Sequence, residues 1–302
     1  MSQVASPSPS SLPASRAGAW LLATRPRTLV AGAVPVLVGT ALAAHQGGAR
    51  AMPALAALLG AVFIQIGTNL VNDYYDFKKG ADRERVGEAR VTSAGLIAPE
   101  QVIAAAGFTA LLAIGVGLYL ASVGGWPIVA IGVASLIAGF AYTGGPFPLG
   151  YHGLGDLFVF VFFGLVAVGG TYFVQAGAWP LMAIIAAIPV GTIGTAIIVV
   201  NNLRDHESDA KVGKRTLAVR FGVAFTRAEY VTLLALAFAT PVVLAVLDER
   251  PFMLLPLLSA PLAIAPLKLV LREQGRPLDR GLALTARLQA AFGLLFALGL
   301  WL

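Results

Sequence analysis

The sequence predicts an all-α protein that crosses a membrane many times. Of its 302 residues, 58% are hydrophobic and only 12% are charged, whereas about 25% of the residues in a soluble domain are charged. The mean hydropathy is +0.81, and apolar runs of about 20 residues, the length that spans a bilayer as a helix, recur along the chain. The chain contains no cysteine, which excludes disulfides and thiolate metal sites.

Nine segments have this apolar character, and we expect nine transmembrane helices around a central cavity that opens to the cytoplasmic side. Residues 1–20 ahead of them form a tail, rich in serine and proline at its start, which we expect to be disordered. We expect residues 21–302 to form a single transmembrane domain. The predicted helices cover residues 28–46, 52–73, 102–123, 126–143, 156–176, 179–202, 229–247, 251–271 and 283–302.

The distribution of lysine and arginine predicts the orientation. If the N-terminus is cytoplasmic, 18 of the 21 basic residues fall in cytoplasmic segments, as the positive-inside rule requires. We therefore expect a multi-pass protein of the cell (inner) membrane with a cytoplasmic N-terminus. The same rule accounts for the net charge of +6 and the pI near 9.8, so we expect no nucleic-acid partner.

The second predicted helix ends in a polar stripe. Asn69, Asn72, Asp73 and Asp76 follow one another at helical spacing on one face, and Asp82 follows in a charged loop. Ionisable side chains at the end of a membrane helix are costly unless they have partners, so they indicate a functional site.

The sixth predicted helix ends in a similar stripe, in which Asn202, Asp205 and Asp209 share a face. In the predicted topology the second and sixth helices both run toward the cytoplasm. The two carboxylate groups should therefore meet at the cytoplasmic mouth of the cavity.

Carboxylate oxygens are the ligands that Mg²⁺ prefers, and a bound substrate phosphate often completes its shell. We therefore expect two Mg²⁺ ions and a diphosphate substrate. The predicted metal ligands are Asp73, Asp76, Asp82, Asp205 and Asp209. The predicted substrate-binding residues are the neighbouring amides, cations and one tyrosine: Asn69, Asn72, Asn202, Arg25, Lys78, Arg83, Lys211, Lys214, Arg215 and Tyr142. The alternatives are loop cations paired with nearby acids, and a tyrosine that only packs.

Two further segments stand out. Residues 141–156 lack lysine and arginine and are rich in glycine and proline, so we expect a turned loop that forms a wall or lid of the cavity. Arg287 and Gln289 lie inside the last predicted helix, where contact with lipid is unfavourable, so we expect both to face the bundle interior.

These residues resemble the UbiA superfamily of intramembrane prenyltransferases. That family carries an N-D-x-x-D motif on its second helix and a D-x-x-x-D motif on its sixth, here Asn72-Asp73-Tyr-Tyr-Asp76 and Asp205-His-Glu-Ser-Asp209. The spacing of Asp82, which five residues separate from Asp76, is similar to that of the naphthoate branch. Four other stretches also look like that branch: Arg25–Thr28, Val91–Leu96, Tyr142–Gly155 and Gly213–Val219.

The resemblance implies catalytic roles for Asp73, Asp76, Asp205 and Asp209 in a site with two Mg²⁺ ions. It implies transfer of a polyprenyl group from a polyprenyl diphosphate to 1,4-dihydroxy-2-naphthoate, with loss of CO2 and diphosphate, to give demethylmenaquinone. Alternative acceptors are 4-hydroxybenzoate, homogentisate and a porphyrin-type alcohol, and an alternative donor carries a phytyl chain. The non-enzyme alternative is a cation-coupled transporter, whose site lies near the bilayer midplane.

Overall fold

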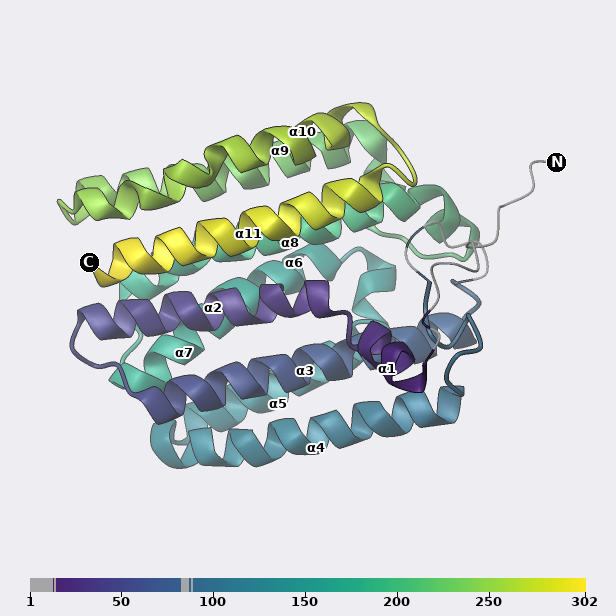
Figure 1. Ribbon diagram of the computed structural model, residues 1–302, viewed down its shortest axis with the longest axis horizontal. Helices are drawn as coiled ribbons and strands as arrows, with labels where there is room; N and C mark the ends of the chain where they lie inside the picture. The colour runs from purple at the N-terminus through teal and green to yellow at the C-terminus, as the bar shows by residue number, and fades with distance from the viewer. Residues whose placement is uncertain (1–12, 14, 83–86, 88) are drawn as a thin grey trace.

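The computed structural model describes residues 13, 15–82, 87 and 89–302, and every regular element within these ranges is a helix. The long helices run side by side along the longest axis of the molecule (Figure 1). They are α2 (Pro26–His45), α3 (Ala51–Lys78), α4 (Pro99–Gly124), α5 (Trp126–Ala141), α8 (Leu181–Lys211), α9 (Leu217–Leu247), α10 (Ala260–Arg272) and α11 (Leu278–Trp301).

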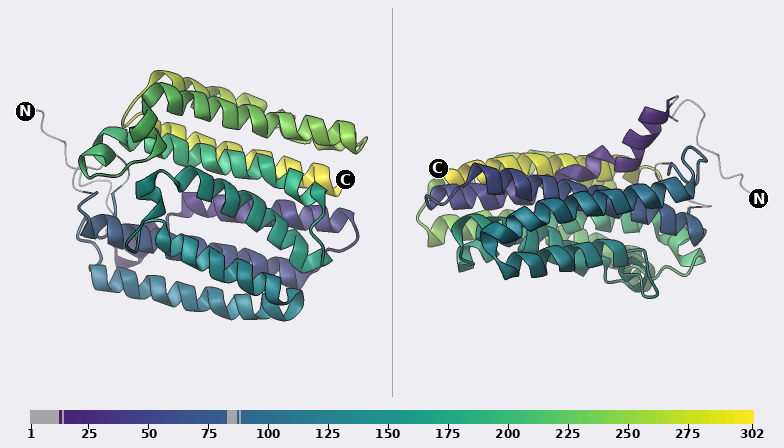
Figure 2. Two further views of the ribbon diagram at one scale, coloured as in Figure 1. Left: turned by 180° about the vertical axis from the view of Figure 1, so that it is seen from behind. Right: turned by 90° about the horizontal axis from the view of Figure 1, so that it is seen from below.

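Shorter elements complete the chain. Helix α1 (Arg16–Thr24) projects from one end of the bundle (Figure 2) and begins inside the range 1–20 that we assigned to the tail. A 3-10 turn, η2 (Leu149–His152), precedes a composite span made of α6 (Gly155–Val159), the π-helix η3 (Phe160–Val166) and α7 (Ala167–Ala176). A second 3-10 segment, η4 (Pro251–Ser259), leads into α10.

In the described part of the chain, eight helical segments are long and apolar enough to cross a membrane, one fewer than the nine expected. The exception is α5, which has 16 residues and is therefore about 24 Å long, shorter than the hydrocarbon core of about 30 Å. The helix ends early because the chain turns at Tyr142 and reaches Gly145, whose φ is 74°. The other eight expected spans each coincide with a long helical segment.

Helix α8 lies at the centre of the bundle. Within its apolar span 72% of the residues are buried, compared with 17% for α4. Val190 and Ile193 of α8 join Phe292 of α11 and Val38 of α2 in the largest apolar cluster. The exposed side of α4 carries large apolar side chains, including Phe108, Leu111 and Leu118, as expected for a surface in contact with lipid. The protein is thus an all-α, multi-pass membrane protein.

The π-helix η3 packs closely against α8. A Cβ atom added to Gly164 would lie 2.8 Å from the Cα atom of Gly191, so the two backbones can touch only because both residues are glycines. A π-helix inside a longer helix often marks a functional site. The packing therefore places an irregular segment beside the central helix.

Candidate functional site

Asp73 anchors the loop that follows α3. Its carboxylate lies in the last two turns of α3 and accepts hydrogen bonds from the backbone N–H groups of Val91 (3.2 Å) and Thr92 (3.1 Å). Because Asp73 is buried, these two bonds supply partners that it would otherwise lack. The segment after residue 89 is thereby fixed against the end of α3.

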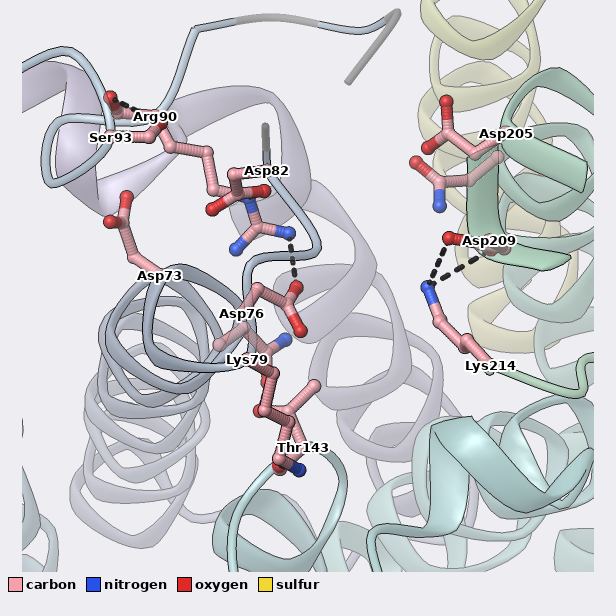
Figure 3. Close-up of polar contacts among 12 residues, drawn as sticks. Asp73, Asp76, Lys79, Asp82, Arg90, Ser93, Thr143, Asp205, Asp209 and Lys214 are labelled. Carbon is pink, nitrogen blue, oxygen red and sulfur yellow. Dashed lines mark hydrogen bonds and ion pairs between the residues drawn. The ribbon is translucent and has the colours of Figure 1, made fainter. Parts of the chain in front are cut away.

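Asp76 lies one turn further along α3, beside Arg90 (Figure 3). Arg90 contacts the Asp76 carboxylate at 2.7 Å and the Asp82 carboxylate at 3.1 Å, and Tyr151 donates its hydroxyl to Asp76 at 2.7 Å. Burial on its own lowers the pKa of Arg90, but the nearby carboxylates outweigh that effect and raise the pKa. Arg90 is therefore a permanent cation between Asp76 and Asp82.

The second carboxylate group lies at the end of α8. Arg204 contacts both oxygens of Asp205, at 2.8 and 2.6 Å, and also reaches Asp279 of α11 at 2.8 Å. Asp209 forms an ion pair with Lys214 at 3.1 Å. Both aspartates are buried. Each is paired with a cation from the end of α8 or from the loop that follows it.

The two groups lie opposite one another (Figure 3), and the charges of both act on Tyr142. Burial raises the pKa of Tyr142, and the charges of Asp156, Asp76 and Asp209 raise it further. Carboxylates from α3, α6 and α8 therefore all affect the pKa of the Tyr142 hydroxyl. A Cβ atom on Gly155 would lie 2.8 Å from that hydroxyl, so the close approach of the loop to α6 requires glycine at this position.

The predicted asparagines have different partners. Asn69 donates to the Thr24 carbonyl at 3.0 Å and to the Thr28 hydroxyl at 2.9 Å, so it holds the junction between α1 and α2. That Asn69 also binds substrate stays a prediction. Asn72 accepts from the Thr143 hydroxyl at 2.6 Å.

Asn202 donates to the carboxylate of Asp156 at 3.4 Å. Asp156 begins the composite span and is buried. It therefore places a further carboxylate beside the predicted site, at the end of the loop of residues 141–156.

Two hollows open at this charged end. One, of about 350 Å³, lies between the loops after α3 and α8 and includes Lys78, Lys79 and Lys211 in its lining. The other, of about 550 Å³, is lined by Lys79, Arg215 and part of the loop of residues 141–156. That loop thus forms one side of this hollow, and its role as a wall or lid of the carboxylate cavity stays a prediction.

The remaining predicted cations are dispersed. Arg25 lies at the junction of α1 and α2, where its backbone has φ of 50°. Lys78 is exposed and lies 4.9 Å from the centre of the Tyr74 ring. Arg83 lies outside the described residues.

The aspartates suit Mg²⁺ in kind, because they offer hard oxygen donors. Among the described residues, however, no three acidic or histidine side chains are grouped as metal ligands. Of the five aspartates predicted as ligands, four contact Arg90, Arg204 or Lys214, and Asp73 accepts from backbone N–H groups. Mg²⁺ bound at these carboxylates would replace such contacts.

Sequence reasoning missed several residues of this site. Arg90 and Arg204 were counted only among the cytoplasmic charges, and Asp156 was given no role. The position of Arg204 directly before Asp205 was a usable signal. No comparable signal exists for Arg90, because its partners depend on how the loop folds.

The last helix separates the two polar residues that we expected inside. Gln289 is buried, as predicted, whereas Arg287 is exposed. The two positions are two residues apart and therefore point in different directions on a helix. The expectation for Arg287 was wrong.

Residues 32–280 match the model of the UbiA prenyltransferase family. The chain belongs to the UbiA prenyltransferase family. It is 41% identical over 245 residues to the 1,4-dihydroxy-2-naphthoate octaprenyltransferase of Mycobacterium tuberculosis, covering 81% of this chain and 83% of that protein. It is 37% identical to the Escherichia coli enzyme of the same name, covering 95% of this chain and 96% of that one.

Solved structures of UbiA proteins share the fold of this chain. A UbiA homologue from Aeropyrum pernix superposes with a TM-score of 0.69 at 14% identity, covering 88% of this chain and 96% of that one. A homologue from Archaeoglobus fulgidus, bound to DMAPP and Mg²⁺, gives a TM-score of 0.63 at 15% identity, covering 92% and 98%. At these identities the likeness establishes the prenyltransferase fold.

Proposed function

We propose that this UbiA protein transfers a polyprenyl group from a polyprenyl diphosphate to 1,4-dihydroxy-2-naphthoate. The reaction releases CO2 and diphosphate and gives demethylmenaquinol, the reduced form of demethylmenaquinone. The observation that carries the proposal is the pair of buried carboxylate groups at the ends of α3 and α8, which lie opposite one another (Figure 3). The names of the bacterial relatives support the choice of acceptor.

The charged end of the bundle suits the diphosphate of the donor. Lys78, Lys79 and Lys211 line a hollow of about 350 Å³ next to the carboxylates, a combination of charges that a polyanion and its counter-ions satisfy together. We propose two Mg²⁺ ions here, which when bound would withdraw charge from the leaving diphosphate as Lewis acids. The proposed ligands are Asp73, Asp76, Asp82, Asp205 and Asp209.

Tyr142 and Tyr151, on the loop of residues 141–156, stabilise the positive charge of the reacting carbon. Burial is the main cause that raises the pKa values of Tyr142 and Tyr151, so both remain neutral aromatic groups near the breaking bond. The bond between the allylic carbon and the diphosphate oxygen breaks, and both electrons leave with the diphosphate. The ring carbon that bears the carboxylate then bonds to the allylic carbon, and CO2 leaves so that the ring regains its aromaticity. Between these two steps the allylic carbon carries a positive charge, which aromatic faces stabilise. The packed bundle excludes water.

The setting follows from the substrates and the charges. We place the protein in the cell (inner) membrane with its N-terminus in the cytoplasm, because most lysines and arginines then lie on the cytoplasmic side. A long prenyl chain dissolves in lipid, so the donor can enter from the bilayer while its diphosphate stays at the charged end. The carboxylates lie in the last two turns of α3 and α8, not near the midplane as the transporter alternative requires.

The test is to incubate membranes containing the protein with candidate aromatic acids and with labelled prenyl and phytyl diphosphates of several lengths. We expect dihydroxynaphthoate to give a prenylated, decarboxylated product by mass, and EDTA to abolish it. A product from 4-hydroxybenzoate or homogentisate alone would refute the proposed acceptor. Full activity in EDTA would refute the proposed use of Mg²⁺.

A further inference from the structure

Gln289 is a polar side chain at the core of the membrane bundle. It lies near the middle of α11 and is 1% exposed. Among the residues that the structure describes, neither its amide nitrogen nor its amide oxygen has a hydrogen-bond partner. An amide without partners is strongly unfavourable in an apolar interior, so something outside the chain should satisfy it.

Comparable residues in the same bundle do have partners. Gln65 and Gln175 are also buried, and their amides bond to neighbouring helices, at 3.3 and 3.0 Å, through threonine hydroxyls. One turn before Gln289 on α11, the hydroxyl of Thr285 lies 2.9 Å from that of Tyr230. The unsatisfied amide is thus a local feature of Gln289 and not a general property of this core.

Gly194 of α8 borders the Gln289 amide. A Cβ atom on Gly194 of α8 would lie 3.4 Å from the Gln289 nitrogen, with Phe163 and Val159 at 3.8 and 3.9 Å. Gly194 thus borders both the Gln289 amide and the irregular span of α6 and η3 beside the central helix. Gly194 lies three turns before Asp205 on the same face of α8, about 16 Å deeper in the bundle.

A line of polar groups connects this position to the charged end. Asn202 donates to the Asp156 carboxylate at 3.4 Å, and Thr195 donates to the Asp156 carbonyl, also at 3.4 Å. Thr195 is the residue after Gly194, the glycine that borders Gln289. Buried polar groups therefore continue inward from the carboxylates along α8.

We infer that the Gln289 amide binds the hydroxylated aromatic acceptor. This inference rests on the proposed function and assigns a residue to its acceptor site. The prenyl chain is a hydrocarbon and offers no hydrogen bonds, and the diphosphate belongs with the cations at the mouth. The acceptor has hydroxyl groups that can donate to the amide oxygen and oxygens that can accept from the amide nitrogen.

The test compares Gln289→Met, which has a similar shape and no amide, with Thr285→Val as a control on the same helix. For Gln289→Met we expect KM for the acceptor to rise about tenfold, as for the loss of one buried hydrogen bond, with KM for the donor unchanged. The melting temperature without substrates should stay the same or rise, because an unsatisfied amide has been removed. Thr285→Val should melt lower and keep both KM values.

Thermal shift without turnover gives an independent readout. Dihydroxynaphthoate should raise the melting temperature of the wild type but not of Gln289→Met, and Gln289→Asn should show an intermediate shift. Equal acceptor KM and equal thermal shift in wild type and variants would overturn the inference, leaving a buried water as the partner. A rise in KM for the donor alone would also overturn it.

Failure of the proposed function has a different signature. A wild type that acts on another hydroxylated aromatic acid would refute the proposed acceptor, and the same comparison made with that acid would then decide the role of Gln289. A wild type that binds and prenylates no aromatic acid would refute both.

Discussion

Replacing Arg90 with glutamine tests whether the buried carboxylates depend on it. Arg90 is 7% exposed and contacts Asp76 at 2.7 Å and Asp82 at 3.1 Å. Removing one partner from a buried ion pair costs about 3–5 kcal/mol. At roughly 2–4 °C per kcal/mol for a chain of this order of size, the melting temperature in EDTA should fall by about 10 °C.

The assay is thermal unfolding of the purified protein in detergent, with and without Mg²⁺. Arg272 is exposed and lies at the same end of the bundle, so Arg272→Gln is the matched control and should change stability by less than about 0.5 kcal/mol. Mg²⁺ should stabilise Arg90→Gln more than the wild type, because the ion no longer competes with a guanidinium. A variant that melts within 2 °C of the wild type in EDTA, at the ~1 kcal/mol level, would refute the reasoning.

Two further predictions concern the loop and the packing of the π-helix. The pKa values of Tyr142 and Tyr151 are raised above their ordinary value of 10.0, so above that pH the unfolded chain loses protons that the folded chain keeps, and stability falls as pH rises. Replacing both with phenylalanine should make the loss of stability above pH 10 shallower in alkaline unfolding curves, and an unchanged slope would contradict the raised pKa values. Gly164→Ala should lower stability by about 1–3 kcal/mol through overpacking against α8, measured by thermal unfolding, and a neutral effect would show that the two backbones can separate.

The positions of the helices were largely predictable, because hydropathy alone reports where a chain crosses lipid. The ends were not. We predicted that α8 ends at residue 202, where the apolar run ends. The helix continues to Lys211 through polar residues, whose helical structure hydropathy does not report. Helix α9 begins at Leu217 rather than 229, where the Thr216 hydroxyl caps it by accepting from the Val219 N–H.

The candidate site was predictable only as two faces of two helices. Helical spacing places Asp73 and Asp76 together, and it does the same for Asp205 and Asp209. It says nothing of the loop residue Arg90, which reaches Asp76 from 14 positions away. Spacing likewise does not report that the junction of α1 and α2 approaches Asn69 and accepts hydrogen bonds from its amide.

The most direct test of the central claim is a calorimetric titration of a prenyl diphosphate into the protein with Mg²⁺. It compares the wild type with Asp76→Asn, Asp205→Asn and the double variant. If the ends of α3 and α8 hold one diphosphate together, each single change should weaken binding at least about tenfold, and the double change should add little more. Wild-type affinity in either single variant would contradict the account.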